Sequence, residues 1–463
     1  MEETISIAIL AAGLGTRMRS KKAKVLHQAG GRTLVEHAVD TALALAPPER
    51  VVVVVGHQAE QVQEAVARHG VRFAVQNEQK GTGHAVGCCR ESLQDNGGLV
   101  IVTYGDCPLL RDETLAALVV AYHDEGAACT VITTELDEPT GYGRILRNAS
   151  GDVIGIVEQK AATPEQLQVR EINSGIYCFN AALLWRHLGD IKPNAASGEL
   201  YLTDMVEILV GKGHRVAAFP IDDASELLGI NTRLELAVAD RLLRERTVRE
   251  HMLAGVTIEK PETVTIDPGA VIGQDTVVEA FAQIRGKTVI GEECRIGTAS
   301  ILTNATIENG AVVEAFSMVA DSRVGTGAKV GPFGRLRMQA HVHTKAVVGN
   351  FVELKKTELG AGSKAQHLAY LGDAVIGEDV NIGAGTITCN YDGVKKHATH
   401  IRPRSFVGSN STLVAPVEIG EGSYIAAGSV ITNSVPEDTL AVGRARQVDK
   451  QGWPSKRRSE QQS

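Results

Sequence analysis

The second half of the chain repeats an aliphatic residue at every sixth position. One unbroken series is Ile266, Ile272, Val278, Ile284, Ile290, Ile296 and Leu302. One-residue slips lead into two further series over residues 307–319 and 324–354, and a last series covers residues 401–431. A period of six fits neither a helix nor a hairpin, but it fits a parallel β-helix in which each hexad is one side of a triangular coil. The aliphatic side chain points inward, and Gly, Asn or Asp takes the corner, where positive φ is needed.

Two stretches interrupt the hexads, residues 360–372 and residues 389–400. After the first interruption the pattern resumes only at Ile376. A coil that only had to stack would not need a loop holding Lys364, His367 and Tyr370, and loops on a rigid scaffold are where binding groups concentrate. We therefore expect functional residues in both interruptions. From the residues alone, an ordinary solvated histidine is the favoured interpretation of His367.

The first half of the chain alternates short apolar runs with helical patterns. Strands are predicted over residues 5–10, 51–55, 71–75 and 99–104, and helices over residues 34–45, 59–68 and 85–93. This alternation predicts a parallel sheet covered by helices on both faces. Ligands of such sheets lie at the carboxyl ends of the strands. The loops after Leu10, Val75 and Tyr104 should therefore share one edge.

The loop after the first predicted strand has the composition of a phosphate-binding loop. It reads Leu-Ala-Ala-Gly-Leu-Gly-Thr-Arg-Met over residues 10–18, and Lys24 follows. Glycines let backbone N–H groups approach a phosphate, and Arg17 and Lys24 add positive charge. The loop lacks the third glycine of a dinucleotide-binding loop and the Gly-Lys-Ser/Thr of a Walker loop. For the glycine pair alone, a tight turn with solvated basic residues remains the alternative.

Composition narrows the class of protein. The 463 residues leave room for two or three domains, and the net charge is -8. The only basic block, at residues 456–458, does not predict a nucleic-acid surface. Seven cysteines without CxxC spacing predict buried free thiols in a reducing cytoplasm. The N-terminus has no secretory pattern, and the longest aliphatic run, residues 51–55, is too short to span a membrane.

Several motifs, in order, resemble the sugar-1-phosphate nucleotidyltransferases. The first is the loop at residues 10–18 with the Lys-Val-Leu of residues 24–26. The later motifs are Gln76, Gly81-Thr82, Tyr104-Gly105-Asp106, Thr140-Gly-Tyr-Gly143-Arg144-Ile145, Glu158, Glu171-Ile-Asn173-Ser-Gly175 and Gly229-Ile-Asn231. Together with the hexads, the chain resembles the bifunctional N-acetylglucosamine-1-phosphate uridyltransferase/glucosamine-1-phosphate acetyltransferases from about residue 7 to residue 446.

This resemblance implies an α/β Rossmann-like nucleotidyltransferase domain followed by a left-handed parallel β-helix. The handedness comes from the resemblance, because the general rule for parallel crossovers favours right-handed winding. The expected divisions are a uridyltransferase domain at 1–231, a linker helix at 232–253, an acetyltransferase β-helix at 254–449 and a disordered tail at 450–463. In the linker, Leu234, Ala237, Val238, Leu242 and Leu243 form one apolar stripe, which predicts a single amphipathic helix.

For the first domain, the resemblance implies uridylyl transfer from UTP to N-acetylglucosamine-1-phosphate. Negative charge accumulates on the phosphoryl oxygens, so Mg²⁺ and cationic side chains should do most of the stabilising. Arg17 is the implied catalytic residue, and Asp106 and Asn231 are the implied Mg²⁺ ligands. Without the resemblance, Asp106 could cap a turn and Asn231 could cap the following helix. The implied nucleotide- and sugar-binding residues are Leu10, Ala11, Ala12, Gly13, Lys24, Gln76, Gly81, Thr82, Tyr104, Gly105, Asp106, Gly143, Glu158, Asn173 and Asn231.

For the second domain, the resemblance implies acetyl transfer from acetyl-CoA to glucosamine-1-phosphate, with His367 as general base. Imidazole suits that role because it titrates near neutral pH. The implied sugar-phosphate residues are Arg337, Lys355, Tyr370 and Asn381. The implied acetyl-CoA residues are Ala384, Asn390, Tyr391, Ser409, Ala427 and Arg444, with Lys396 a further candidate.

The resemblance also implies a homotrimer with the acetyl site between subunits. Two other functional classes are the alternatives: a monofunctional sugar-1-phosphate nucleotidyltransferase with a structural β-helix, and a non-enzymatic sugar-nucleotide sensor. His341 and His343 alternate on one predicted strand face, but no third ligand is spaced to complete a zinc site.

Overall fold

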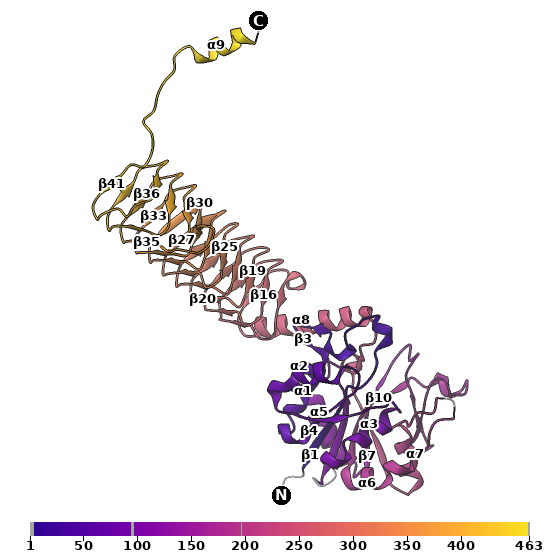
Figure 1. Cartoon of the computed structure of the whole chain (residues 1–463). Helices are drawn as coiled ribbons and strands as arrows, with labels where there is room; N and C mark the ends of the chain where they lie inside the picture. Colours follow the sequence, from indigo (N-terminus) through magenta and orange to yellow (C-terminus); the bar gives the residue numbers. More distant parts are fainter. Residues whose placement is uncertain (1–3, 94–96, 196, 462–463) are drawn as a thin grey trace. The chain divides into compact units, whose positions relative to one another are not determined.

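The computed structural model describes residues 4–93, 97–195 and 197–461. The chain divides into two compact units, Met1–Leu243 and Arg244–Ser463. Figure 1 labels their elements. The first unit is built on a nine-stranded sheet, and the second is a stack of coils formed by three further sheets.

The sheet of the first unit is mixed. Its main path runs β11-β7-β10-β6-β1-β4-β5, with β8 and β9 paired off this path. The strands are β1 (Ile5–Leu10), β4 (Val51–Val55), β5 (Arg72–Val75), β6 (Leu99–Tyr104), β7 (Cys129–Glu135), β8 (Arg144–Arg147), β9 (Val153–Val157), β10 (Glu171–Asn180) and β11 (Val216–Pro220). Strand β1 pairs in parallel with β4 and β6, whereas β10 runs antiparallel to β6 and β7.

Helices cover both faces of this sheet, as the sequence predicted. They are α1 (Leu34–Leu43), α2 (Ala59–Val66), α3 (Thr82–Cys88), α4 (Arg90–Leu93), α5 (Asp112–Asp124), α6 (Ala181–His187) and α7 (Asp204–Gly211). Ile7 and Ile9 of β1 belong to one buried cluster, and Ala8 and Leu10 belong to another. Successive side chains of a strand point to opposite faces, so β1 has a core on each side.

The antiparallel strand β10 departs from the expected all-parallel arrangement. Parallel neighbours need a long crossover, which is usually a helix. Residues 136–170, between β7 and β10, form the hairpin of β8 and β9 and one short 3-10 turn, with no α-helix. The chain therefore returns to the sheet in the opposite direction.

Helix α8 (Arg233–Leu253) lies where the linker helix was predicted. Its start is a capping box, because Glu235 N donates to Thr232 Oγ1 at 3.2 Å and Thr232 N donates to the Glu235 carboxylate at 2.7 Å. The prediction that the apolar stripe of this helix is packed was partly wrong, since Leu234 is 82% exposed and Val238 is 41% exposed. The packed residues are Ala239 with Leu236, Leu242 and Leu243 in the first unit, and Val248 in the second.

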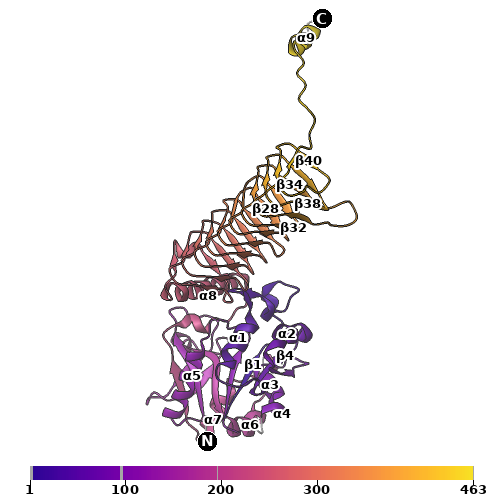
Figure 2. The same ribbon diagram turned by 90° about the vertical axis from the view of Figure 1, so that its left-hand side faces the viewer.

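The second unit is a left-handed parallel β-helix with three strands in each coil. Each strand pairs in parallel with the strand one coil later, as in β25 with β28 and β28 with β31. The three sheets contain eleven, ten and nine strands. Every aliphatic residue of the four hexad series is buried in one continuous core. In Figure 2 the coils appear as a stack.

The upper coils contain the predicted acetyltransferase residues. The eleven-stranded sheet contributes β27 (Val347–Asn350), β30 (Lys364–His367), β33 (Asn381–Ile382) and β36 (Phe406–Val407). The ten-stranded sheet contributes β25 (Arg335–Arg337), β28 (Glu353–Lys355), β31 (Tyr370–Gly372) and β34 (Ile387–Cys389). The nine-stranded sheet contributes β26 (His341–Val342), β29 (Glu358–Leu359), β32 (Ala374–Ile376) and β35 (Thr399–Ile401).

The first predicted interruption of the hexads is wrong. Residues 360–372 contain strands β30 and β31, and Ala365 and Leu371 take the inward positions with no exposed surface. Leu359, Ala365, Leu371, Ile376 and Ile382 therefore continue the hexads with one slip. The pattern was missed because the inward residue at position 365 is only an alanine. His367 lies at the end of a regular strand.

The second interruption is a true loop. Residues 390–398 leave the stack between β34 and β35, and β35 then pairs with β32 from Ala374↔Thr399 to Ile376↔Ile401. In the tail, residues Trp453–Glu460 form helix α9, none of whose residues is buried. All seven cysteines are free. Among the helices of the described residues, none has the length and apolar character that crossing a bilayer requires.

Replacing an inward hexad residue should loosen the stack locally. We expect Leu336→Ala to cost about 2–5 kcal/mol, because it leaves a cavity in a fully buried column. Amide hydrogen exchange of residues 318–355 measures this loss as faster opening in the whole chain. The exposed Lys329→Ala on the neighbouring sheet should leave exchange unchanged. Equal exchange in both variants would contradict the inward column.

Candidate functional sites

A cavity of about 290 Å³ lies at the carboxyl ends of β1, β5 and β6 in the first unit. It gathers most of the predicted nucleotide-binding residues, which are Leu10, Ala11, Ala12, Gly13, Lys24, Gln76, Gly81, Thr82, Tyr104 and Asp106. Gly105 lies beside them, because a Cβ there would come within 3.0 Å of Ala11. The edge predicted from parallel pairing is therefore the edge that carries this cavity.

Three polar lining residues were not anticipated from the sequence: Gln79, Glu199 and Tyr201. Residues 199–201 reach the cavity because Leu200 pairs with the loop before α3. Leu200 N donates to Lys80 O, and Gly83 N donates to Leu200 O, both at 2.8 Å. A Cβ at Gly81 would lie 2.5 Å from Leu200 O, so this approach requires glycine there. A contact across about 120 positions has no local sequence signal.

The two predicted metal ligands converge on a single cation. The ammonium group of Lys24 is in contact with Asp106 Oδ2 and donates to Asn231 Oδ1 at 3.1 Å. Asn231 does not cap helix α8, since Thr232 performs that role, and its side-chain oxygen is left to accept from Lys24. The side chains of Lys24 and Asp106 are only 13% and 15% exposed. The two oxygens are therefore placed to share a positive charge.

This donor set fits Mg²⁺. The ion takes one or two protein oxygens and keeps waters and phosphates as its other ligands. In the described part of the chain, no three or more His, Cys, Asp or Glu side chains are grouped to hold a metal. Asp106 and Asn231 would hold the ion, and bound phosphates would have to complete its coordination.

Arg17, the predicted catalytic residue, does not line this cavity. It lies on the short 3-10 helix Thr16–Met18, with an exposed side chain. Gly15 precedes this helix with φ 62°, and a Cβ there would come within 2.6 Å of Lys24 Cβ. Glycine at position 15 thus lets the loop pack against Lys24, and the 3-10 helix that carries Arg17 follows directly.

The predicted sugar-binding residues lie beside Tyr104. Asn173 N donates to Gly143 O at 2.9 Å, and Asn173 Oδ1 accepts from the hydroxyl of Tyr177 at 3.0 Å. Glu158 follows β9, which pairs with β8 next to Gly143. Burial raises the pKa of Glu158, and the nearby Asp204 raises it further. Gly143, Glu158 and Asn173 are therefore brought together.

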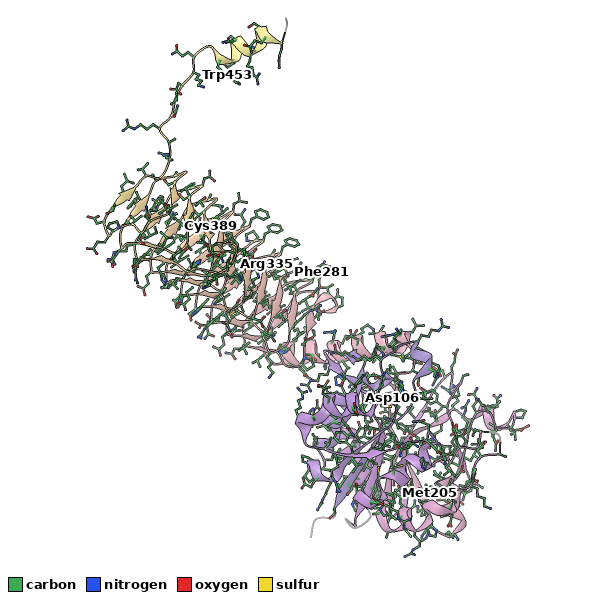
Figure 3. The ribbon with its side chains drawn as sticks, viewed as in Figure 1. Asp106, Met205, Phe281, Arg335, Cys389 and Trp453 are labelled. Carbon is green, nitrogen blue, oxygen red and sulfur yellow. The ribbon has the colours of Figure 1, made fainter. Side chains whose placement is uncertain are left out.

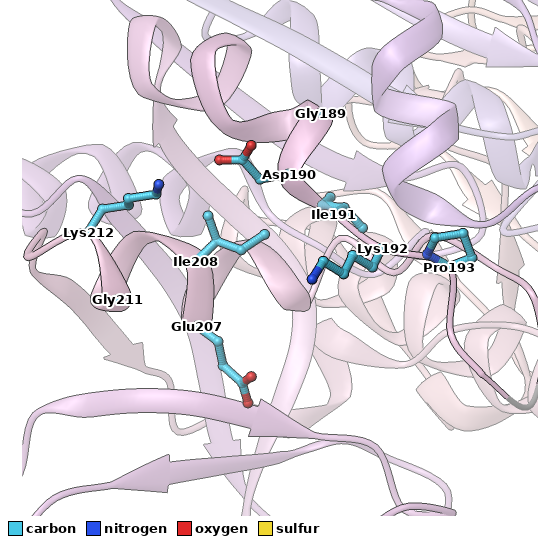
Figure 4. Close-up of a pocket in the computed structure, with 9 residues that line it drawn as sticks. All are labelled: Gly189, Asp190, Ile191, Lys192, Pro193, Glu207, Ile208, Gly211 and Lys212. Carbon is cyan, nitrogen blue, oxygen red and sulfur yellow. The ribbon is translucent and has the colours of Figure 1, made fainter.

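Another cavity of the first unit, about 620 Å³, contains no predicted site residue (Figure 4). Its charged lining residues are Asp190, Lys192, Glu207 and Lys212. These side chains carry two positive and two negative charges, so the cavity has no clear preference for an ion of either sign.

In the second unit, two predicted sugar-phosphate residues share one column of the ten-stranded sheet. Arg337 pairs with Lys355, and Lys355 pairs with Gly372 one coil higher. The hydroxyl of Tyr370 lies over Gly372, where a Cβ would come within 2.5 Å of it. Arg337, Lys355 and Tyr370 are therefore neighbours on one outer face. Asn381 lies on the eleven-stranded sheet, which faces another direction.

Lys355 is almost completely buried and lies between two partners. Its ammonium is 3.5 Å from Asp373 Oδ2, and Lys396 approaches it from the loop at residues 390–398. Contact with Lys396 and the charge of Asp373 raise the pKa of Lys355, whereas contact with Lys355 lowers the pKa of Lys396. Two amines held together beside one carboxylate are suited to an added anion such as a phosphate.

Asp373 and Asn350 were not anticipated from the sequence. Asp373 Oδ2 also accepts a hydrogen bond from Asn390, so one oxygen joins a predicted sugar-phosphate residue to a predicted acetyl-CoA residue. Asn350 Oδ1 accepts from His367 Nδ1 at 2.9 Å, and the two residues are register partners in β27 and β30. Asp373 was overlooked because an aspartate at a positive-φ corner is what the coil itself favours.

Four predicted acetyl-CoA residues follow one another at a single corner of the stack. Asn410 N donates to Ala384 O, Gly428 N donates to Ser409 O, and Arg444 Nη1 donates to Ala427 O, at 2.7–2.8 Å. Asn390 and Tyr391 start the loop that leaves the stack. On the nine-stranded sheet, the rings of His341 and His343 stack with centroids 3.8 Å apart, away from these residues.

The raised pKa of Glu158 makes the stability of the first unit depend on pH. Below its ordinary pKa, the carboxyl is protonated in both the folded and the unfolded state. As the pH rises through that value, the unfolded state loses the proton first, so burial of this carboxyl lowers the free energy of unfolding. Glu158→Gln should therefore be more stable than the wild type at about pH 8 and equally stable near pH 4. Urea denaturation followed by the fluorescence of the buried Trp185 reports on the first unit. The exposed Glu64→Gln is the control, and an equal gain there would contradict the prediction.

Comparison with known proteins agrees with the two kinds of fold found along the chain. Residues 7–163 match the MobA-like NTP transferase domain, residues 260–356 match the GMPPB C-terminal domain, and residues 398–433 match the bacterial transferase hexapeptide repeats. The bifunctional protein GlmU of Solibacter usitatus is 58% identical over 458 residues, covering 99% of this chain and 98% of that protein. Those of Koribacter versatilis and Pelobacter propionicus are 48% and 47% identical, and each alignment covers at least 97% of both chains. The chain therefore belongs to the GlmU family of bifunctional proteins.

Proposed function

We propose that the chain makes UDP-N-acetylglucosamine in two steps, with one step in each unit. The second unit transfers the acetyl group of acetyl-CoA to glucosamine-1-phosphate. The first unit then transfers the uridylyl group of UTP to N-acetylglucosamine-1-phosphate and releases pyrophosphate. The observation that carries the proposal is the presence of two separate groups of polar residues. Lys24 lies with Asp106 and Asn231 in the first unit, and Lys355 lies with Arg337, Tyr370 and Asp373 in the second unit, where His367 is hydrogen-bonded to Asn350.

In uridylyl transfer, a phosphate oxygen of the sugar attacks the α-phosphorus of UTP, and the bond to pyrophosphate breaks. Mg²⁺, when bound, neutralises the charge that develops on the phosphoryl oxygens. Asp106 and Asn231 would hold this ion, and the Lys24 ammonium, which contacts both residues, would then be free to turn toward the phosphates. Arg17, on its exposed 3-10 helix, has room to close over the nucleotide.

In acetyl transfer, the sugar amine attacks the thioester carbon, the carbon–sulfur bond breaks, and the CoA thiol leaves. His367 Nδ1 donates to Asn350 Oδ1, so Nε2 is the nitrogen left to accept the amine proton. Lys355, Lys396 and Arg337 offer positive charge to the sugar phosphate. The small residues at positions 384, 409 and 427 leave the corner open for acetyl-CoA.

The proposal includes a homotrimer and a cytoplasmic location. Both rest on the family resemblance, and the seven free cysteines are compatible with a reducing compartment. A monofunctional nucleotidyltransferase with a structural β-helix is the alternative, and it predicts no acetyl transfer at all.

We expect Asp106→Asn to abolish uridylyl transfer, because a neutral amide holds Mg²⁺ poorly. Release of pyrophosphate from UTP and N-acetylglucosamine-1-phosphate should fall by at least about 100-fold. Acetyl transfer should be unchanged in the same preparation. The exposed Asp222→Asn should retain both activities. Full uridylyl transfer in Asp106→Asn would remove this residue from the proposed site.

We expect His367→Gln to lower acetyl transfer by about 100- to 10,000-fold, because the general base is lost. Release of the CoA thiol from acetyl-CoA in the presence of glucosamine-1-phosphate is the measurement. Uridylyl transfer should persist, and His343→Gln, on another face of the same unit, should retain both activities. If the wild-type chain releases no thiol, the monofunctional alternative holds instead.

A further inference from the structure

The ammonium group of Lys24 takes the two oxygens that the proposed metal needs. It is in contact with Asp106 Oδ2 and donates to Asn231 Oδ1 at 3.1 Å. Figure 3 labels Asp106 in the first unit. A lysine ammonium and a hard divalent cation both seek such oxygens, and two positive charges at one small site repel each other. The ammonium and the ion are therefore alternative partners of Asp106 and Asn231.

The two oxygens are fixed by the chain around them. Ile230 N donates to Asp106 O at 2.9 Å, which brings residue 231 beside the loop that follows β6. The side-chain nitrogen of Asn231 donates to Gly229 O at 3.1 Å, so the side-chain oxygen is the atom that faces Lys24. Asn231 is thereby held in place, and an exchange of partners has to be made by the lysine.

The Lys24 side chain is anchored at its base and flexible at its end. Lys24 begins the 3-10 helix Lys24–Leu26, and Gly15 lies so close that a Cβ there would come within 2.6 Å of Lys24 Cβ. Beyond Cβ, the side chain is a flexible stem that carries a point charge. It lines the cavity of about 290 Å³ together with Gly13 and Thr82, where the phosphates of the nucleotide are proposed to lie. The ammonium therefore has phosphate oxygens within the range of its stem, without movement of the backbone.

We propose that Lys24 occupies the metal position until a nucleoside triphosphate enters the cavity, so that Asp106 and Asn231 take up a divalent cation only together with the nucleotide. This inference rests on the proposed uridylyl transfer, which needs both ligands. Without the nucleotide, a cation gains two protein oxygens but has to break two charge-assisted hydrogen bonds. With the nucleotide, Lys24 gains phosphate oxygens as new acceptors, and the cation gains phosphates as further ligands. Binding of the metal and binding of the nucleotide are therefore cooperative.

The plain alternative is an ion pair that only stabilises the fold. The side chains of Lys24 and Asp106 are 13% and 15% exposed, so removal of the lysine would leave a nearly buried carboxylate without a cation. A purely structural pair predicts a less stable chain that binds neither ligand better than before. A lysine that competes with the metal predicts opposite changes, namely tighter binding of the metal and weaker binding of the nucleotide.

The test replaces Lys24 with an uncharged side chain of similar length and measures the two ligands separately on the full chain. Mn²⁺ takes the same oxygen ligands as Mg²⁺, and electron paramagnetic resonance counts its free form. Without nucleotide, we expect Lys24→Met to bind Mn²⁺ about 10- to 100-fold more tightly than the wild type. In the presence of EDTA, calorimetry should show that the same variant binds UTP at least about 10-fold more weakly.

Two further variants locate the effect. Lys24→Met/Asp106→Asn should lose the gain in Mn²⁺ affinity, which places that gain at this site. The matched control is Lys22→Met, which replaces an exposed lysine of the same loop and should bind Mn²⁺ as the wild type does. If Lys24→Met unfolds, as judged by circular dichroism, Lys24→Gln decides the question, because glutamine keeps N–H donors without the charge.

Equal Mn²⁺ affinity in Lys24→Met and the wild type, or undiminished binding of UTP by that variant, would overturn the proposal. Release of pyrophosphate from UTP is measured separately. Tighter Mn²⁺ binding by Lys24→Met, together with a wild-type chain that releases no pyrophosphate, would remove the proposed function and leave the competition between Lys24 and the metal established.

Discussion

Parallel pairing of strands is the interaction on which both groups of polar residues depend. In the first unit, β1 runs between β4 and β6 in the same direction, so the loops that follow these strands meet at one edge and close the cavity around Lys24 and Asp106. In the second unit, parallel pairing stacks each strand directly over the one below. Residues 17 or 18 positions apart, such as Asn350 and His367, thereby become neighbours.

The hexads and the strand–helix alternation were sufficient to predict a parallel β-helix and the parallel part of the first sheet, because each depends on a local period. The left-handed winding was implied only by the resemblance, and the antiparallel strand β10 was not predicted. Strands β1, β4 and β6 have the predicted bounds, since buried parallel strands are continuous apolar runs. A periodic pattern of large aliphatic residues does not reveal an inward position that is occupied by a small residue. Ala365 takes the inward position of its coil and is fully buried, but an alanine does not stand out as a hexad residue, so the segment around His367 was misread as a loop.

In the first unit, site residues could be predicted where their motif lies within one loop or at the end of one strand. Glu199 and Tyr201 were not predicted, because they reach the cavity only through the backbone hydrogen bonds of Leu200 with a loop that is distant in the sequence. Asp373 was not predicted for another reason. Aspartate is common at corners with positive φ, so its presence there did not suggest a functional role. Helix α8 shows the reverse error, in which a sequence stripe containing Leu234 suggested packing that the structure gives to Ala239.

The coil-by-coil register also restricts how the length of such a chain can vary. Adding one residue within a strand would turn each later side chain of that strand to the other face, so inward aliphatic residues would become outward ones. The loop between β34 and β35 avoids this, because the chain rejoins the stack with Thr399 opposite Ala374 and the pairing continues unaltered. Relatives of this protein should therefore differ in length at the corners or by whole coils, and positions such as residues 390–398 are where new segments can be acquired without disturbing the column beneath.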